Sequence, residues 1–471
     1  MAVPENRQPS FAAVARPAPA GTVRERGVRL LWGLTLLSLP WVGADLILLL
    51  TGRDAGVGLQ PSWLLMALLW VFAWRFVAFR NAPRMVPWVG GAMLVAVAVS
   101  AGGLWAAPAD APPGVAMTRY FKQSAQLAIM ASFAVWPILN LRGCDAWRRT
   151  ARWLVAGALV QVAYGAAQQV AFYHPLPALT ALERIFTSNP SILSGSGQLY
   201  VGDRFLAVPR LRGTACEPLY LGNYLLLVIP MVFLTGWRRR WQGAALGALG
   251  LLLLLTWSRG AWLGAGAGLV FALALSRGAG ASRRHSAPRR RAGWGLVAIM
   301  LLSGLVMVAW APARLPVQRL LQSFSTHDWS NLTRLYSVQA AWRAFCLSPV
   351  CGIGWGQFGW HFAGLVDPAG LQAMFTWPVV ANFPMLVLCE TGLVGFGALL
   401  ATGVGAARAV AGRARGAAPA ELVAATAAVA GIGVQALTFS QYNLAHAWIA
   451  LGLLGAALLR ETETAGGGGA S

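Results

Sequence analysis

The sequence predicts an all-α integral membrane protein with about twelve transmembrane helices. Of its 471 residues, 57% are hydrophobic and only 11% are charged, and the mean hydropathy is +0.59. A soluble domain could not bury that much apolar surface, whereas a polytopic membrane protein exposes it to lipid. The 22 tryptophans also fit the aromatic belts that form where membrane proteins meet the lipid headgroups.

Apolar runs long enough to cross the hydrocarbon core divide the chain into the expected helices. We expect these helices at about 30–50, 61–79, 85–105, 124–141, 153–173, 218–236, 242–257, 260–276, 294–312, 383–407, 421–440 and 444–459. Residues 29–460 therefore form one membrane domain. Residues 1–28 and 461–471 are expected to be disordered cytoplasmic tails, and the first of them lacks the apolar segment of a removable signal peptide.

Arginine clusters on alternate loops predict the orientation of the helices. Lys and Arg collect on cytoplasmic loops, so the clusters at 24–26, 80–84, 142–152, 238–240, 283–291 and 408–415 place both termini in the cytoplasm. The stretch 106–123 and the two long loops, 174–217 and 313–382, are then external, and the two long loops can meet over one site. The same bias accounts for the net charge of +22, so no nucleic-acid partner is expected.

Cysteine labelling tests this orientation. In a variant without the native cysteines, we expect Ser325→Cys to react with a membrane-impermeant thiol reagent in intact cells. Ser286→Cys should react only after lysis, because the arginine-rich loop around it is cytoplasmic. Labelling of Ser286→Cys in intact cells would contradict the topology.

Four arginines on three external segments run against the positive-inside bias. Arg210 and Arg212 precede the helix expected from Pro218, Arg259 lies in a tight turn between two apolar runs, and Arg334 lies in the long loop. The planar guanidinium binds phosphate oxygens bidentately, so these arginines are candidates for a diphosphate clamp. The alternatives are anchoring at lipid headgroups and pairing with acidic residues.

The long external loop carries a glycine run, Gly352-Ile-Gly354-Trp-Gly356, that superficially resembles a phosphate cradle. It lacks the preceding strand and following helix of a dinucleotide site, and a tight turn that folds the loop back onto the membrane is the simpler interpretation. Cys346 and Cys351 lie in the same loop, and their spacing permits a disulfide in an oxidising compartment.

Three titratable residues are candidates for acid–base chemistry. Glu390 falls inside an apolar run, where a carboxylate is costly and suggests function, although it could instead be a structural partner for an external arginine. Glu217 stands at the start of its helix, where negative charge is favoured. His361 is a candidate base or simply a solvated histidine. No Cys or His spacing typical of zinc is present, and no metal or cofactor is expected.

Four stretches, in order, resemble the O-antigen ligase and polymerase superfamily. Together they cover about 210–400. Arg210-Leu-Arg-Gly213-Thr, followed by Glu217-Pro218, resembles its R-x-x-G element, and Ser258-Arg259-Gly260-Ala261 is similar to its S-R-G-A turn. Arg334 to Trp342, Pro349 and Gly352 to Phe358 resemble its R…W…P-x-x-G-I-G-x-G-x-F stretch. Asn382 to Gly395 is similar to its H-N…E-x-G-x-x-G segment.

One position departs from the family pattern. The family often has a histidine, taken as the acceptor-activating group, where this chain has Ala381. The candidates for a substitute base are His361, Asp367, Glu217 and Glu390. Glu390 is favoured here, because apolar surroundings tend to raise the pKa of a carboxyl group, and a raised pKa suits a base. Alternatively, the chain relies on stabilisation of the diphosphate alone, or it belongs to a divergent branch of the family.

The resemblance implies a metal-independent glycosyltransferase in the inner membrane of a bacterium, surrounded by membrane lipids, with its active site facing the periplasm. It would take a glycan from a polyprenyl-diphosphate donor, such as undecaprenyl diphosphate, and pass it to a sugar hydroxyl. The acceptor would be lipid A-core for a ligase in lipopolysaccharide biosynthesis, or another glycan for an exopolysaccharide polymerase. A protein O-glycosylating relative would use the same chemistry.

The resemblance also assigns roles to the residues. Arg210 or Arg212, with Arg259 and Arg334, would bind the leaving diphosphate. The residues expected to contact substrate are Glu217, Asn382, Gly352 and Gly354. A flippase for lipid-linked glycan is the alternative from a different class, but the sequence shows neither a charged path across the bilayer nor inverted repeats.

Overall fold

The computed structural model describes residues 23–54, 58–74, 85–106, 113–189, 200–201, 208–277, 329–366, 379–415 and 418–466. Within these ranges the fold is helical, apart from one antiparallel pair of two-residue strands, β1 (Tyr200–Val201) and β2 (Val208–Pro209). The helices are α1 (Val23–Leu37), α2 (Leu46–Thr51), α3 (Pro61–Ala73), α4 (Met85–Ser100), α5 (Pro113–Asn140), α6 (Gly143–Tyr173), α7 (Pro177–Phe186), α9 (Pro218–Met231), α10 (Arg239–Leu255), α11 (Arg259–Arg277), α14 (Trp329–Leu347), α15 (Phe358–Val366), α16 (Phe383–Arg413), α17 (Ala420–Gln435) and α18 (Ala445–Gly466). Short 3₁₀ segments follow α4 (Ala101–Ala106), α9 (Val232–Leu234) and α17 (Ala436–Thr438).

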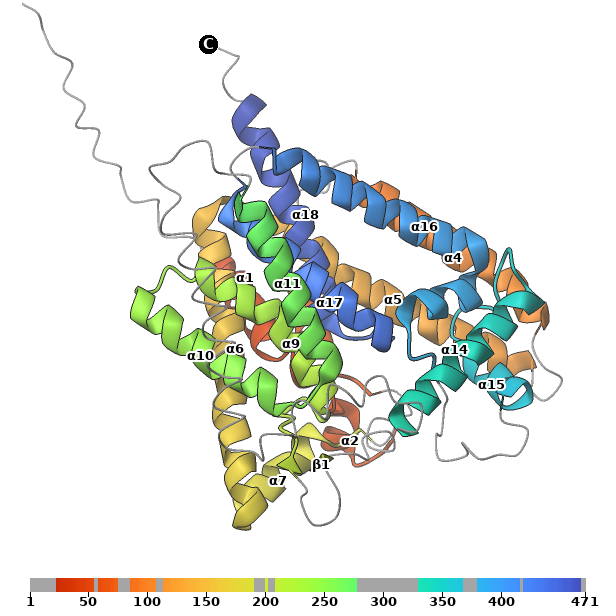
Figure 1. Cartoon of the computed structure of the whole chain (residues 1–471), viewed down its shortest axis with the longest axis horizontal. Coiled ribbons are helices and arrows are strands. Elements are labelled where there is room, and N and C mark those ends of the chain that lie inside the picture. The colour runs from red at the N-terminus through yellow and green to blue at the C-terminus, as the bar shows by residue number, and fades with distance from the viewer. Residues whose placement is uncertain are drawn as a thin grey trace, which may run out of the picture.

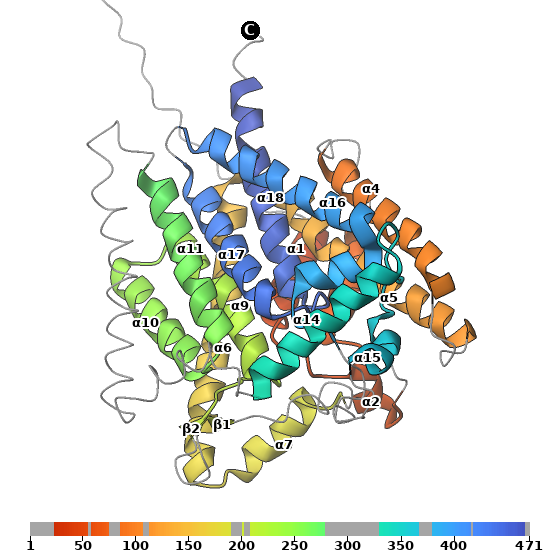
Figure 2. The same ribbon diagram turned by 45° about the vertical axis from the view of Figure 1, so that its right-hand side comes forward.

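The helices pack around two hydrophobic cores. The larger core joins α1, α3, α5, α6, α9, α10, α11, α17 and α18, with α11 against α17 and α18 against α5. The smaller core lies between α14, α15 and the first turns of α16. Figures 1 and 2 show α7, α14 and α15 toward the end of the molecule remote from the C terminus. Of these helices, α14 carries Arg334 and α15 carries His361.

Four described helical segments are long and apolar enough to cross a membrane. They are Gly143–Tyr173, Arg259–Ser276, Phe383–Arg413 and Ala420–Thr438. Four more apolar helices are shorter, at Pro61–Ala73, Met93–Trp105, Pro218–Leu234 and Ala445–Arg460. The expected all-α, multi-pass character is confirmed by these helices. The expected total of about twelve stays a prediction, and the run at 294–312 lies outside the described residues.

The first expected span, 30–50, is not one helix, and that prediction is wrong. Helix α1 ends at Leu37 and α2 begins at Leu46. Pro40 has no backbone N–H with which to continue the helical ladder. Asp45 then starts a new helix, because its carboxylate accepts hydrogen bonds from the N–H groups of Ile47 (2.9 Å) and Leu48 (3.3 Å).

Parts of both expected tails are helical. Helix α1 already begins at Val23, and α18 continues to Gly466. The stretch expected as external loop 106–123 is also largely helical, because α5 begins at Pro113. Hydropathy marks the apolar centre of a helix but not its polar ends, so these helices extend beyond the apolar runs that predicted them.

Candidate functional site

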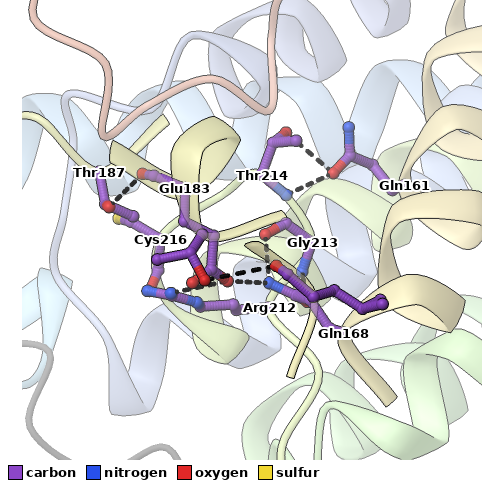
Figure 3. Close-up of polar contacts among 10 residues, drawn as sticks. Gln161, Gln168, Glu183, Thr187, Arg212, Gly213, Thr214 and Cys216 are labelled. Carbon is purple, nitrogen blue, oxygen red and sulfur yellow. Dashed lines mark hydrogen bonds and ion pairs between the residues drawn. The ribbon is translucent and has the colours of Figure 1, made fainter. Parts of the chain in front are cut away.

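Two glutamines of α6 form hydrogen bonds to the backbone of the turn that follows Arg212. Gln168 exchanges hydrogen bonds with the N–H (3.0 Å) and carbonyl (3.1 Å) of Gly213, and Gln161 accepts from the N–H (2.8 Å) and hydroxyl (2.9 Å) of Thr214 (Figure 3). Gly213 adopts φ +57°, and a side chain there would collide with Gln161, so only glycine fits. The turn is therefore fixed in position relative to the bundle.

The structure separates the roles of Arg210 and Arg212. Arg212 forms a salt bridge to Glu183 of α7 (Nη2 to Oε1, 3.0 Å) and donates to the carbonyl of Cys216 at 3.3 Å (Figure 3). Arg210 instead donates from Nε to the carbonyl of Thr256 at 3.1 Å, at the end of α10. Arg212 thus follows the alternative interpretation, pairing with an acidic residue, and Arg210 faces the turn that carries Arg259.

Glu217 is the N-cap residue of α9, but its side chain makes no capping hydrogen bond. Because Pro218 occupies the first helical position, one backbone donor is missing there. The carboxylate interacts with Arg210, with the Tyr220 hydroxyl, which donates a hydrogen bond to it, and with Arg334. Burial raises the pKa of Glu217 to about 7, and these three neighbours oppose that rise. The Glu217 carboxylate therefore interacts with two arginines from other segments instead of capping its own helix.

Two residues with strained backbone conformations accompany the charged groups. Cys216 (φ 56°) and Trp257 (φ 51°) are the non-glycine residues with positive φ among those the structure describes. Cys216 directly precedes Glu217, and Trp257 lies two residues before Arg259. Such conformations cost about 1–3 kcal/mol each and cluster at functional sites. Their coincidence with Glu217 and Arg259 supports a site at this position independently of any motif.

Arg259, the first residue of α11, is 8% exposed. Its guanidinium donates to the side-chain oxygen of Asn331 in α14 at 3.2 Å. Asn331 stands three residues before Arg334, which interacts with Glu217. Arg210 and Arg334 thus act on Glu217, and Arg259 contacts the helix that carries Arg334 through Asn331. These three arginines are called the arginine cluster, and their role as a diphosphate clamp stays a prediction.

Ala381 contacts α14, the helix that carries Arg334, through the side chain of Ser337. Its N–H donates to the Ser337 hydroxyl at 3.1 Å, and that hydroxyl donates to the carbonyl of Arg334 at 2.8 Å. The position at which the family often has histidine is therefore beside the turn of α14 that carries Arg334. Asn382, the next residue, caps α16 by accepting from the Met385 N–H at 2.9 Å and donates to the Leu437 carbonyl at 2.9 Å. These contacts give Asn382 a structural role.

The glycine run is inserted into a break in α16. Gly392 has φ 63° and ψ −162°, which interrupts the helix. The carbonyls of Cys389 and Glu390 accept from the N–H groups of Ile353 (2.9 Å) and Gly354 (3.1 Å). On the other side of the break, the N–H of Leu393 donates to the Pro349 carbonyl at 2.8 Å.

The insertion requires close backbone contact. A Cβ at Gly352 would overlap the backbone of Glu390 and Thr391. Gly352 and Gly354 thus form a tight turn against α16, as the simpler interpretation of the glycine run expects, and the contacts show no open phosphate cradle there.

Glu390 holds the second half of the glycine run. Its two carboxylate oxygens accept from the N–H groups of Gly356 (2.9 Å) and Phe358 (3.1 Å). Arg119 of α5 interacts electrostatically with Glu390 and donates to the Gly356 carbonyl at 2.8 Å. These contacts favour the structural alternative for Glu390, a partner for an external arginine.

His361 lies in the smaller core and is only 3% exposed, so it is not a solvated loop histidine. It belongs to α15, next to Phe358 and Phe362, which are part of that core. Burial lowers its pKa to about 4, so the ring is neutral at pH 7. No contact of His361 with the arginine cluster is present in the described part of the chain.

Two further expectations concern cysteines and metals. Cys346 and Cys351 are both free thiols, so the disulfide that their spacing permits is not formed in this structure. Among the described residues, no group of three or more His, Cys, Asp or Glu side chains could hold a metal ion. Asp367, one of the candidate bases, lies outside the described residues.

Sequence reasoning missed Arg119 and the two glutamines of α6. Arg119 lies in the stretch 106–123 that the arginine pattern predicts to be external, so the signal that singled out Arg210, Arg259 and Arg334 applies to it as well. Gln161 and Gln168 carry no such signal. A glutamine inside an apolar helix shows its role only when its partner, here the Gly213 turn, is known.

Comparison with protein families supports the resemblance stated from the motifs. No curated protein and no solved structure matches the chain. A family model described as O-antigen ligase matches residues 244–400, which include Arg259, Arg334, the glycine run and Glu390. The turn from Arg210 to Glu217 lies before the match. The resemblance to the O-antigen ligase and polymerase superfamily is thus confirmed over residues 244–400 of this chain.

Proposed function

We propose that this protein transfers a glycan from a polyprenyl-diphosphate carrier to a sugar hydroxyl at the outer face of the bacterial cytoplasmic membrane. One observation carries the proposal: Arg210 and Arg334, from two segments, act on the same carboxylate, Glu217, and Arg259 of a third segment contacts Asn331, three residues before Arg334. A cluster of guanidinium groups next to apolar helices suits a ligand with a diphosphate headgroup and a hydrocarbon tail.

In the proposed reaction the acceptor oxygen attacks the anomeric carbon of the donor sugar. The bond from that carbon to the diphosphate breaks, and its electron pair leaves with the polyprenyl diphosphate. The three guanidinium groups bind the negative charge as it develops, which lowers the barrier. They supply the charge that a divalent cation supplies at other phosphate sites, so the proposal needs no metal.

The experiment uses purified protein with a lipid-diphosphate-linked glycan and an acceptor, and it scores transfer by gel shift or mass. We expect Arg210→Ala, Arg259→Ala and Arg334→Ala each to lower turnover about 10²-fold or more while the protein inserts normally. Arg→Lys variants should also be impaired, because an ammonium group lacks the bidentate fork.

Two exposed arginines serve as matched controls. Arg184 lies on the external helix α7, and Arg343 lies on α14, the helix of Arg334. Alanine at either position should leave transfer near the wild-type rate. Near wild-type transfer by both Arg259→Ala and Arg334→Ala would refute the clamp and reopen a transport role.

The glycan profile of a deletion strain identifies the acceptor. Loss of a ligase should leave finished polymer on the lipid carrier and bare lipid A-core. Loss of a polymerase should leave single repeat units. Loss of glycan from a protein, with both polysaccharides intact, would assign the protein-glycosylating alternative.

A further inference from the structure

We propose that Glu217 is the proton acceptor for the attacking hydroxyl, an inference that rests on the proposed glycan transfer. Its carboxylate lies at the arginine cluster and is not used to cap its own helix. The proposal assigns the acid–base role to the external turn before α9, which lies outside the family match.

The backbone holds this carboxylate at the N-terminal end of α9. Cys216 takes up a strained conformation with φ 56°, and the Glu217 N–H bonds back to the carbonyl of Ala215 at 2.6 Å. Pro218 fixes the start of the helix directly after it. Strain of this kind persists only where the surrounding structure holds it. Arg212 donates to the Cys216 carbonyl, and Gln161 and Gln168 hold the preceding Gly213 and Thr214.

The groups around Glu217 suit a proton acceptor next to a leaving group. The charged or titratable neighbours that act on it are Arg210, Arg334, Tyr220 and Cys216. Arg210 and Arg334 are proposed to bind the diphosphate, so the sugar carried by that diphosphate would lie close to Glu217. A base must come within about 2.6–3.2 Å of the hydroxyl, or reach it through one water.

The other candidate bases have different surroundings. Both oxygens of Glu390 accept backbone hydrogen bonds, and His361 is buried in the smaller core. Ala381, which lies beside the Arg334 turn, has no titratable group. Among the described candidates, Glu217 is the carboxylate that interacts with the arginine cluster.

Proton transfer and bond cleavage are coupled in the proposed step. The acceptor hydroxyl gives its proton to the Glu217 carboxylate as its oxygen bonds to the anomeric carbon. The carbon–oxygen bond to the diphosphate breaks, and the electron pair leaves with the phosphate. Glu217, now neutral, releases the proton to water before the next cycle.

The titration of Glu217 then predicts the pH dependence. A base must be ionised to accept a proton, and the pKa of Glu217 is raised to about 7. Transfer by the wild-type protein should therefore fall as the pH is lowered through about 7. General-base catalysis typically raises a reaction rate about 10²–10⁴-fold, so Glu217→Gln should lower the transfer rate at least about 10²-fold. The variant should also lose the fall in rate at low pH, which is called the acid limb of the pH profile.

Glu217→Gln should still bind the donor. Loss of a negative charge beside Arg210 and Arg334 cannot weaken their attraction for a diphosphate, so donor affinity should be equal or higher. We would measure binding of polyprenyl diphosphate itself, together with abundance and thermal unfolding. This separates a lost proton acceptor from a misfolded protein.

Tyr220→Phe supplies a second test that a purely structural role would not pass. The Tyr220 hydroxyl stabilises the ionised carboxylate, so its removal should shift the acid limb to higher pH. The phenyl ring can still pack on Phe439, whose ring lies 5.6 Å away. Glu183→Gln, a change to another carboxylate of this region, should keep the acid limb where it is.

Two outcomes would overturn the inference while the proposed function stands. One is an unshifted acid limb in Tyr220→Phe, and the other is a wild-type rate and pH profile in Glu217→Gln. Failure of the wild-type protein to transfer glycan at any pH would instead reject the proposed function itself. The two failures are therefore distinguishable.

Discussion

Gly392→Ala is expected to abolish accumulation of the folded protein, whereas Gly397→Ala, on the same helix, should have little effect. The backbone at Gly392 (φ 63°, ψ −162°) is essentially restricted to glycine. A Cβ there would overlap the Val350 carbonyl oxygen and lie 2.6 Å from the Gly352 nitrogen. At Gly397 a Cβ meets nothing within 4 Å.

The cost at Gly392 combines backbone strain with displacement of the inserted loop. We expect the substitution to lower the free energy of unfolding by more than about 4 kcal/mol, a loss that few domains tolerate. Abundance after detergent extraction and the midpoint of thermal unfolding measure the effect. If Gly392→Ala matched Gly397→Ala in both, the loop would not be inserted into the helix break.

Glu390→Gln is expected to lower stability and transfer together. The carboxylate accepts from two backbone N–H groups, at Gly356 and Phe358, and an amide NH₂ cannot accept. One buried N–H then loses its acceptor, and Arg119 loses the charge with which it interacts. A buried donor left without its acceptor typically costs about 1–3 kcal/mol of folding free energy, and more beside a charged group.

The comparison that isolates this effect is Glu421→Gln. Glu421 pairs with Arg460 (2.5 Å) and is more accessible than Glu390, so its loss should cost about 1 kcal/mol or less. A double-mutant cycle with Arg119→Met measures the coupling between Arg119 and Glu390, which should be non-additive. Lost transfer with unchanged thermal stability in Glu390→Gln would instead favour the catalytic role first expected for this residue.

The pairing between loop and helix explains how remote residues position the arginine cluster. Pro349 to Phe358 is bonded to α16 at both ends, through the helix break and through Glu390. The same segment follows α14 directly, and α14 carries Asn331 and Arg334. Fixing the loop to α16 thereby fixes the orientation of α14 over the start of α11, where Arg259 lies.

The class of this protein could be predicted from the sequence, because it depends on sums and spacings along the chain. Composition and long apolar runs predict membrane helices whatever the order in which they pack. The motifs predicted a resemblance to the superfamily, and the match over residues 244–400, which contains the motifs from Ser258 to Gly395, confirms it there. Local chemistry also anticipated that Gly352 and Gly354 would make a tight turn.

The roles of individual charged residues could not be predicted, because each depends on a partner far away in the sequence. Arg210 and Arg212 lie two residues apart and are equivalent by spacing. Their difference comes from Glu183 on α7 and from the carbonyl of Thr256. Glu390 is likewise an isolated carboxylate in the sequence, and its function as an anchor appears only with Arg119 beside it.

The sequence by itself therefore determined the membrane environment, the helical class and the set of charged residues available for chemistry. Only the tertiary structure decided which of them meet, through the break at Gly392, the strained turn at Cys216 and the contact between Arg259 and Asn331. The physical reason is that burial and charge pairing depend on distance in space. In a helical membrane protein, residues that meet in space can lie hundreds of positions apart along the chain, as Arg119 and Glu390 do.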